Sequence, residues 1–265
     1  MEYLVFRLYG AMASWGEIAV GEMRHSSNYP SKSAIVGLLG AALGLRREDD
    51  DAHMNLTNTY QQAVKVLSAG RLLKDYHTAQ APDSVGKFHY RTRRDEIVTG
   101  HERLGTVLST REYYVDAQAV VAIRANEQAK WALTELQQAL CKPKFHLYLG
   151  RKSCPLAAPL DPKTIEADGF LQALENYAVQ PLLYSSPDKP IPEWMSETRW
   201  LPQDSLSRYY WEGNISDFAK DEGGFSKQQV QQLTRHDKPL SRQRWQFQQR
   251  KEYCWMNDAN LAKEA

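Results

Sequence analysis

Hydrophobic residues near the start of the chain predict a strand that is followed by a buried helix. Residues 3–9 are mostly apolar and rich in β-forming side chains, which is typical of a strand. Residues 34–45 form an almost wholly apolar run that is too short to span a membrane, so it predicts a helix in the core. The flanking residues are typical of helix ends, because Ser31 or Ser33 can cap the start and Gly44 can close the end.

Apolar periodicity predicts further elements after this helix. Residues 62–69 and 111–123 alternate between apolar and polar positions, as half-buried strands do. The pattern also predicts an extended piece over residues 72–78, a helix over residues 127–141 that is capped by Asn126, and a strand over residues 145–149. Together these pieces give the order β-α-β-β-α-β over residues 1–150, which is that of a ferredoxin-like or RNA-recognition-motif domain. The predicted fold class is therefore α+β.

Two regions fall outside this repeating order. Residues 79–110 form a long insertion with few apolar anchors, and a loop of this length in a compact domain is usually functional or disordered. If residues 87–94 and 97–99 are extended, the insertion projects as a hairpin arm. Residues 151–265 contain proline clusters and scattered tryptophans, and they predict an irregular, β-rich C-terminal region. Within it, residues 241–255 look extended and mix aromatic with cationic side chains.

Composition limits how the chain can bind nucleic acid and metals. The 33 Lys and Arg residues balance 32 Asp and Glu residues, so local patches must supply any attraction to phosphates. The three cysteines are widely spaced, and residues 46–51 end in consecutive aspartates that predict a charged surface turn, so we expect no metal and no cofactor. The sequence has no signal peptide and no membrane-length apolar run, so we expect a cytoplasmic protein without a membrane partner.

A first cationic patch lies in the insertion, where residues 87–94 contain no carboxylate. Its cations can meet phosphates, and the interleaved Phe88 and Tyr90 can stack on bases, which are the two parts needed to bind single-stranded nucleic acid. The four cations are Lys87, Arg91, Arg93 and Arg94.

A second patch brackets the strand predicted over residues 145–149. Gly150 can bring the backbone close to a phosphate chain, and the cations around it are Lys142, Lys144, Arg151 and Lys152. The start of the first helix could also hold a phosphate, because Lys32 lies at that start and Arg24 is just upstream. These patches favour RNA binding.

Catalysis is a weaker interpretation of the same residues. Side chains that could act as general acid or base in metal-independent RNA cleavage are His25, Tyr29, His77, His89, His101 and His146. No pair of them has a diagnostic spacing, and the chain has no phosphate loop or nucleophile elbow. We therefore expect a non-catalytic protein. A metal-independent endoribonuclease that acts through His77 or Tyr29 stays the main alternative, and a general single-strand RNA chaperone is the third.

Several motifs occur together in a fixed order over roughly residues 1–160. They are residues 15–16 (WG), 30–33 (PSKS), 37–41 (GLLGA), 75–78 (DYHT), 111–113 (REY) with Asp116, and 149–156 (LGRKSCPL). This ordered set resembles the CasD family of the RAMP superfamily, which are subunits of the type I-E CRISPR surveillance complex, Cascade. The likeness fades past about Glu193.

The resemblance implies a ferredoxin-like domain with a thumb-like hairpin over residues 79–110. It implies binding to the 5′ handle of the CRISPR RNA (crRNA), capping of the backbone-subunit filament and contact with the large subunit, while a separate subunit cuts the RNA. Target DNA near the thumb is a further candidate partner. Combined with the charge patches, the candidate RNA-binding residues are Arg24, Lys32, Ser33, His77, Lys87, Arg91, Arg93, Arg94, Arg111, Lys144, Gly150, Arg151 and Lys152, with Phe88 and Tyr90 for stacking.

Overall fold

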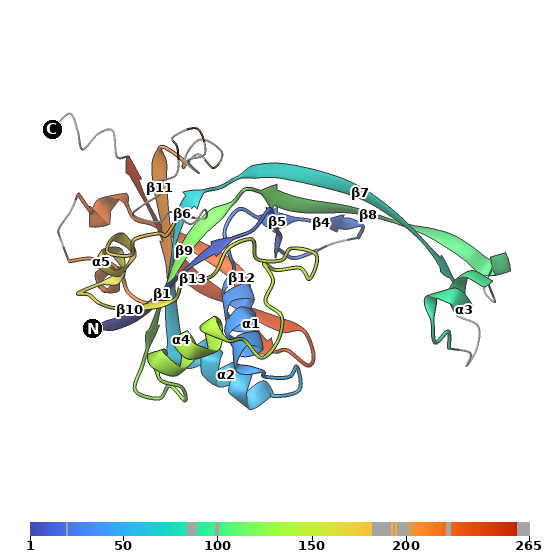
Figure 1. Ribbon diagram of the computed structural model, residues 1–265, viewed down its shortest axis with the longest axis horizontal. Helices are drawn as coiled ribbons and strands as arrows, with labels where there is room; N and C mark the ends of the chain where they lie inside the picture. Colours follow the sequence, from blue (N-terminus) through green and yellow to red (C-terminus); the bar gives the residue numbers. More distant parts are fainter. Residues whose placement is uncertain are drawn as a thin grey trace.

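A seven-stranded antiparallel sheet forms the body of the protein, and a long two-stranded arm projects from it (Figure 1). The computed structural model describes residues 1–19, 21–83, 89–98, 101–181, 192, 194, 201, 203–220 and 224–258. The strand order of the sheet is β10-β1-β9-β6-β11-β13-β12. In chain order these strands are β1 (Glu2–Tyr9), β6 (Tyr60–Ser68), β9 (Gln118–Ala125), β10 (Lys163–Glu166), β11 (Leu206–Trp211), β12 (Gln231–Ser241) and β13 (Gln246–Asp258).

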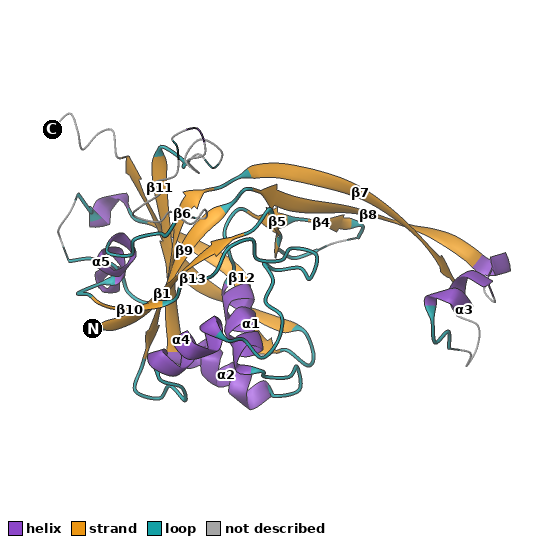
Figure 2. Ribbon diagram, viewed as in Figure 1, coloured by secondary structure: helices purple, strands orange, loops and turns teal. Residues whose placement is uncertain are grey.

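Helices cover both faces of this sheet, as Figure 2 shows, so the protein has a mixed α/β fold. One face carries α1 (Lys32–Leu43), α2 (Asp50–Thr59) and α4 (Leu133–Cys141), and the other carries α5 (Phe170–Glu175). The alternation of side chains along β1 divides the two hydrophobic cores. Leu4 and Phe6 pack with the first three helices, whereas Tyr3 and Val5 pack with Phe170. Single 3-10 turns occur at Ile215–Asp217 and Lys227–Gln229.

The local signals at the start of the chain are confirmed. The predicted helix is α1, whose N-cap is Ser31, because the Ser31 Oγ accepts a hydrogen bond from the Ala34 N–H at 3.2 Å. Gly44 ends the helix in the left-handed conformation with φ of 80°. The strands predicted over residues 3–9 and 62–69 are β1 and β6.

The single strand predicted over residues 111–123 is wrong, because the structure contains two strands there. The chain leaves the arm at Val115 and enters β9 at Gln118, and Asp116 between them has φ of 59°. Aspartate tolerates this left-handed conformation better than most residues. Ala117 is buried, so the alternation of apolar and polar residues continues through the turn. Periodicity alone therefore does not reveal the turn.

The strand predicted over residues 145–149 is also wrong. Leu147 and Leu149 are buried and Tyr148 is exposed, which produces the alternating pattern, but the segment is a loop against α1. Its backbone bonds to the end of that helix, where the Phe145 N–H donates to the Ala41 carbonyl at 3.1 Å. The strand that follows α4 is instead β10.

Two helix predictions need correction as well. The helix expected from residue 127 begins at Leu133, and the Asn126 side chain instead accepts a hydrogen bond from the Gln128 N–H at 2.9 Å in the preceding turn. The charged turn expected over residues 46–51 runs directly into α2, which sequence analysis missed. Among the buried residues of α2 are His53, Leu56 and Thr57, so its apolar signal is weak.

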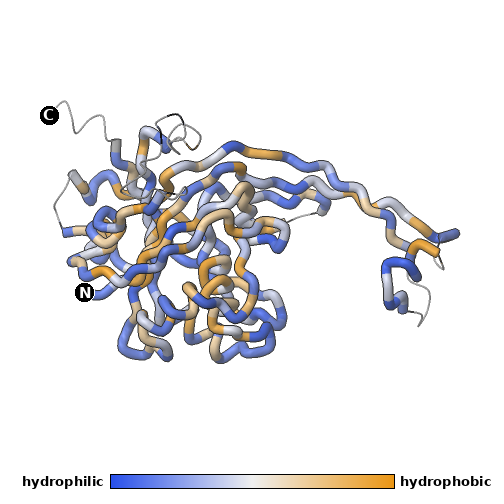
Figure 3. The backbone as a smooth tube through the Cα atoms, in the orientation of Figure 1, coloured by the Kyte–Doolittle hydropathy of each residue, from blue (hydrophilic) through white to orange (hydrophobic). Residues whose placement is uncertain are grey.

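The arm is formed by β7 (Arg71–Pro82) and β8 (Leu104–Val115), which pair along their whole length. Twelve paired residues span roughly 35–40 Å at about 3.3 Å per residue. The arm starts eight residues before the predicted insertion, and its tip carries α3 (Arg93–Val98) and a 3-10 turn at His101–Arg103. Residues 93–98 are therefore helical and not extended, while residues 84–88, 99 and 100 lie outside the described part. Hydrophilic and hydrophobic positions are mixed along the arm (Figure 3).

Short strands tie the base of the arm to the body. They are β2 (Met12–Ala13), β3 (Trp15–Gly16), β4 (Met23–Arg24) and β5 (Ser26–Ser27), of which β2 and β4 pair with β8. The strands after residue 150 join the same sheet as β1, so both predicted segments of the chain share one layer. In the ranges given above, no helix has the length and apolar character needed to cross a membrane.

Candidate nucleic-acid interface

A pocket of about 680 Å³ lies where the start of α1, the loop after α4 and the β12–β13 hairpin meet. Among the residues that line it are Ser33, Gly150, Arg151, Arg242, Trp245 and Phe247. Three predicted RNA-binding residues, Ser33, Gly150 and Arg151, are thus brought together from positions more than a hundred residues apart. The volume is within the usual range for sites that bind small molecules or cofactors, roughly 300–1,000 Å³.

Gly150 allows the cationic loop to lie against the start of the chain. It has φ of 82°, and a Cβ atom at this position would lie 1.9 Å from the Ser14 carbonyl oxygen. Arg151 then donates from its Nε to the Ser14 Oγ at 2.9 Å, and its guanidinium lies 5.4 Å from the centroid of the Tyr113 ring. In the described part of the chain, no carboxylate forms an ion pair with Arg151. The side chain is therefore oriented in advance, with Nη donors left for an anion.

Replacing Gly150 with alanine should lower the free energy of unfolding by about 2 kcal/mol or more, because the new Cβ would force the loop away from Ser14. The matched control is Gly16→Ala, since a Cβ at Gly16 would meet no atom within 4 Å. Chemical denaturation of both variants checks this prediction. Equal stability of the two variants would show that the close approach of this loop does not matter.

The base of the arm contributes a second group of polar side chains. Glu112 of β8 accepts from the Ser26 N–H at 3.3 Å and pairs with His25 at 3.2 Å and with Lys74 at 3.5 Å. Burial alone would raise the pKa of the Glu112 carboxyl, but these hydrogen bonds hold that pKa below its usual value. Glu112 therefore links β5 and β7 to β8 at the base of the arm.

Arg111 and Arg24 are neighbours at this base. They are register partners where β4 pairs with β8, and Arg111 also lies opposite Asp75 on β7. The Arg111 Nε is buried and has no hydrogen-bond partner within the ranges that the structure describes. Arg24 donates to the Met23 carbonyl at 3.1 Å. Arg111 is two residues before Tyr113, whose ring contacts the guanidinium of Arg151. Arg111 and Arg151 therefore both lie near the base of the arm.

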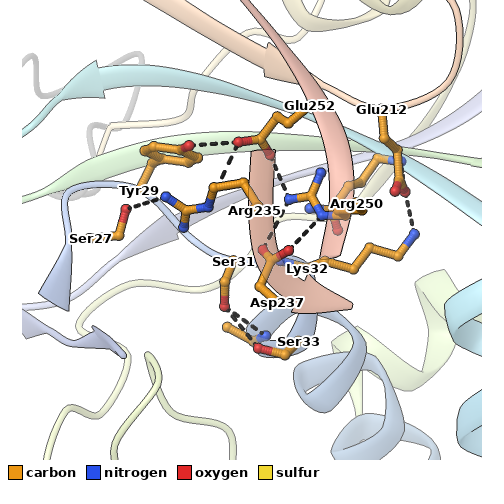
Figure 4. A network of polar contacts seen from close by, with 12 residues as sticks. Ser27, Tyr29, Ser31, Lys32, Ser33, Glu212, Arg235, Asp237, Arg250 and Glu252 are labelled. Carbon is orange, nitrogen blue, oxygen red and sulfur yellow. Dashed lines mark hydrogen bonds and ion pairs between the residues drawn. The ribbon is translucent and has the colours of Figure 1, made fainter. Parts of the chain in front are cut away.

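The start of α1 is not free to hold a phosphate. Asp237 of β12 occupies it, because one Asp237 oxygen accepts from the Lys32 N–H at 2.8 Å (Figure 4). The Lys32 side chain is only 3 % exposed, and its Nζ donates to the Tyr60 carbonyl at 2.7 Å and pairs with Glu212. Burial lowers the pKa of Lys32, although Glu212 opposes this effect. The position of Lys32 therefore does not support its predicted contact with RNA.

The same buried network includes Tyr29, one of the two residues considered for catalysis. Its Oη donates to Glu252 at 2.6 Å, and its ring stacks on Tyr210 with the centroids 3.7 Å apart. Burial and the nearby Glu252 carboxylate raise the pKa of Tyr29 far above its usual value, so it is a poor general base. The other candidate, His77, lies on the exposed arm with its Nδ1 3.9 Å from Asp75. The structure does not bring the two together.

Most of the remaining predicted residues that the structure describes do not line the pocket. Arg91, Arg93 and Arg94 lie at the tip of the arm, where Arg93 pairs with Glu96 at 2.6 Å. Tyr90 is also at the tip, while Lys87 and Phe88 lie outside the described residues. Lys144 lies at the opposite end of α1 from Ser33, since its backbone N–H donates to the Ala42 carbonyl. The two predicted cationic patches therefore do not form one surface. Lys152 is exposed next to Arg151.

Sequence analysis missed the residues that the β12–β13 hairpin brings to the pocket. Trp245 and Phe247 are exposed there, and Arg242 donates to the Ser33 carbonyl. The only signal was the mixture of aromatic and cationic residues over 241–255, which does not reveal what the hairpin packs against. Among the described residues, no group of three His, Cys, Asp or Glu side chains could hold a metal ion.

Comparison with known proteins identifies the family. A family model described as CRISPR-associated protein (Cas_Cas5) matches residues 3–253, so the chain belongs to this family of CRISPR-associated proteins. Over 183 residues, 66% of this chain and 76% of the relative, it is 36% identical to the CRISPR system Cascade subunit CasD of Escherichia coli (strain K12). A solved structure titled CRISPR RNA-guided surveillance complex has a similar fold, with a TM-score of 0.61 at 21% identity over 96% of this chain and 89% of that chain. The predicted family is confirmed.

Proposed function

We propose that this chain is a non-catalytic, crRNA-binding subunit of a type I-E Cascade complex, and that it holds the 5′ handle of the crRNA. The observation that carries the proposal is the geometry of Arg151, which is anchored on Ser14 and Tyr113 at the base of the arm and has no carboxylate partner in the described chain. The family match and the name of the E. coli relative support the complex to which the subunit belongs.

In this proposal the handle follows the cationic loop from the pocket to the base of the arm. Arg151 and the exposed Lys152 contact phosphates, and Arg111 and Arg24 continue the positive surface along β8 and β4. Phosphate contacts fix the position of the strand without reading its sequence. Such contacts make binding depend on salt, with a slope of about −0.7 per neutralised phosphate on a single strand.

We further propose that the body contains a ferredoxin-like unit and that the arm is the thumb of this family. The chain order β1-α1-β6-β9-α4-β10 supports the first point, apart from the added α2. The assignment of the arm as the thumb is supported by its position in the chain, because β7 and β8 are inserted between β6 and β9. The domain division predicted at residue 150 stays a prediction.

The arm supports the proposal of protein partners. An isolated two-stranded ribbon is marginally stable in water, and this one leaves Leu72, Tyr76 and Val107 exposed. The proposed partners that cover it are the Cascade backbone subunit and the large subunit. The cations Arg91 and Arg94 at the tip are the basis for proposing target DNA as a further partner there. A cytoplasmic location is part of the same proposal.

A gel experiment with repeat-derived RNA tests the function. A 5′-labelled RNA that contains the handle is incubated with the full chain in EDTA and run on native and denaturing gels. We expect a shifted but intact RNA. Replacing Arg151 and Lys152 with alanine should weaken binding and reduce the salt slope by about 1.4, which is two phosphate contacts.

The control variant for this test is Lys130→Ala with Lys220→Ala, which removes the same charge from two exposed positions away from the pocket. Its affinity and salt slope should equal those of the wild type. An unchanged slope in the Arg151 and Lys152 variant would remove the loop from the RNA site. A discrete cleavage product that disappears in His77→Ala or Tyr29→Phe would make this chain an endoribonuclease instead.

A further inference from the structure

The turn between β12 and β13 carries an exposed aromatic residue in a strained conformation. Residues 242–245 form the turn, and its last residue, Trp245, has φ of 56°. Bulky residues avoid this left-handed region, where glycine and asparagine are the usual choices. Trp245 is also 61% exposed, so burial does not compensate for the strain. Strain of this kind is found mainly where a side chain is needed for function.

Contacts from α2 and the loop before it hold this turn in place. Asp50 accepts from the Arg242 N–H at 3.0 Å and from the Ser241 Oγ at 2.7 Å. Arg47 donates from its Nε to the Arg242 carbonyl at 2.8 Å, and its guanidinium lies 5.3 Å from the centroid of the Trp245 ring. One face of the indole is therefore supported by a cation, and the turn is fixed before any ligand binds.

Trp245 opens onto the pocket that contains Arg151. Phe247 lines the same pocket and meets the Trp245 ring edge to face, with the centroids 5.5 Å apart. Arg242 closes one side, since its guanidinium packs on Gly37 and donates to the Ser33 carbonyl. The two carboxylates of the pocket, Glu17 and Asp237, are each paired with an arginine. The pocket thus combines an aromatic surface with arginine side chains, and its two carboxylates are already neutralised by ion pairs.

We propose that Trp245 stacks on one unpaired base of the RNA strand whose phosphate is held by Arg151. This inference rests on the proposed function and adds to it a base-binding position from the C-terminal hairpin. Aromatic surface next to cations is the combination that binds single-stranded nucleic acid, whereas an apolar protein segment would leave Arg151 and Arg242 without an anionic partner. Removing one stacked base or its aromatic partner typically weakens binding about 5- to 150-fold.

The test uses the full chain and a series of handle RNAs, each with a single abasic site at a successive position. In the wild type we expect one position at which loss of the base weakens binding 5-fold or more. In Trp245→Ala that position should lose its effect, while the penalties at all other positions remain. Trp245→Phe should retain most of the wild-type behaviour, because phenylalanine also stacks.

Trp245→Gly separates a binding role from a structural one. Glycine adopts the left-handed conformation without strain, so this variant should unfold at the same or a higher temperature than the wild type and still bind RNA 5-fold or more weakly. If RNA binds with an Arg151-dependent salt slope but no abasic position is coupled to Trp245, the inference is wrong and the proposed function stands. If Trp245→Gly binds RNA normally but fails to assemble with the other subunits, Trp245 is a protein contact. If no handle RNA binds, the proposed function falls and this inference with it.

Discussion

Replacing Asp237 with alanine should lower the free energy of unfolding by about 3–5 kcal/mol, because it breaks a buried ion pair and also leaves an N–H at the start of α1 without its acceptor. Asp237 is 8% exposed, and its carboxylate accepts from Arg250 at 2.7 and 3.0 Å and from the Lys32 N–H at 2.8 Å. In the variant, Glu252, at 2.6 Å, is the one anionic partner that the buried guanidinium of Arg250 keeps within the described part of the chain. Chemical denaturation at neutral pH measures the loss.

The same pairing makes the loss depend on pH. Burial alone would raise the pKa of the Asp237 carboxyl, but its hydrogen bonds with Arg250 and the charge of that arginine hold the pKa below its usual value. Such a group stabilises the fold above its unfolded pKa of about 4, and this contribution disappears as the pH falls through the lower, folded value. The stability of Asp237→Ala should therefore approach that of the wild type in acid. The exposed control Glu127→Ala should follow the wild type throughout. A constant difference between Asp237→Ala and the wild type from neutral pH into acid would contradict this account.

Replacing Lys32 with methionine should lower the free energy of unfolding by about 3 kcal/mol and leave the salt dependence of RNA binding unchanged. Methionine keeps much of the apolar length of the side chain, so the change removes mainly the charge that pairs with Glu212 and the hydrogen bond to the Tyr60 carbonyl. The Glu212 carboxylate, whose side chain is 13% exposed, is then left without this cation. Denaturation curves and RNA titrations at several salt concentrations measure the two effects separately.

An exposed lysine–carboxylate pair provides the comparison. Lys220 lies 3.9 Å from Asp168, and both side chains are more than 70% exposed, so Lys220→Met should change stability little. If Lys32→Met instead preserved stability and reduced the salt slope of RNA binding, Lys32 would belong to the RNA site. The buried network in Figure 4 would then be a poor guide to its role.

Local signals were enough to predict the first strand and α1. A capping serine marks the start of that helix and a glycine marks its end, and both are adjacent to it in sequence. The turn at Asp116 was missed because Ala117 beside it is buried like a strand residue. The loop over residues 145–149 was mistaken for a strand because contact with α1, and not pairing with another strand, buries Leu147 and Leu149. Periodicity reports which residues are buried, and it does not report what buries them.

The candidate site was predictable only where its chemistry is local in sequence. Glycine followed by two cations indicated the loop of Arg151, which the structure places in a pocket. The burial of Lys32 could not be foreseen, because its partners Tyr60 and Glu212 lie 28 and 180 positions further along the chain. The aromatic wall of the pocket depends in the same way on contacts between residues 241–242 and Asp50, nearly two hundred positions earlier.

The contact between Lys32 and Asp237 also has a consequence for synthesis on the ribosome. The N-terminal end of α1 is completed by a residue 205 positions later, and at about 5–20 residues per second that residue is made roughly 10–40 s after the helix. Before the β12–β13 hairpin is synthesised, the ion pair between Arg250 and Asp237 cannot form, and the pocket lacks the side that this hairpin supplies. A nascent chain released before residue 231 would therefore lack both the closed helix end and the aromatic side of the RNA site. Such a chain would keep the Arg151 loop but lack Trp245, the residue proposed to stack on a base.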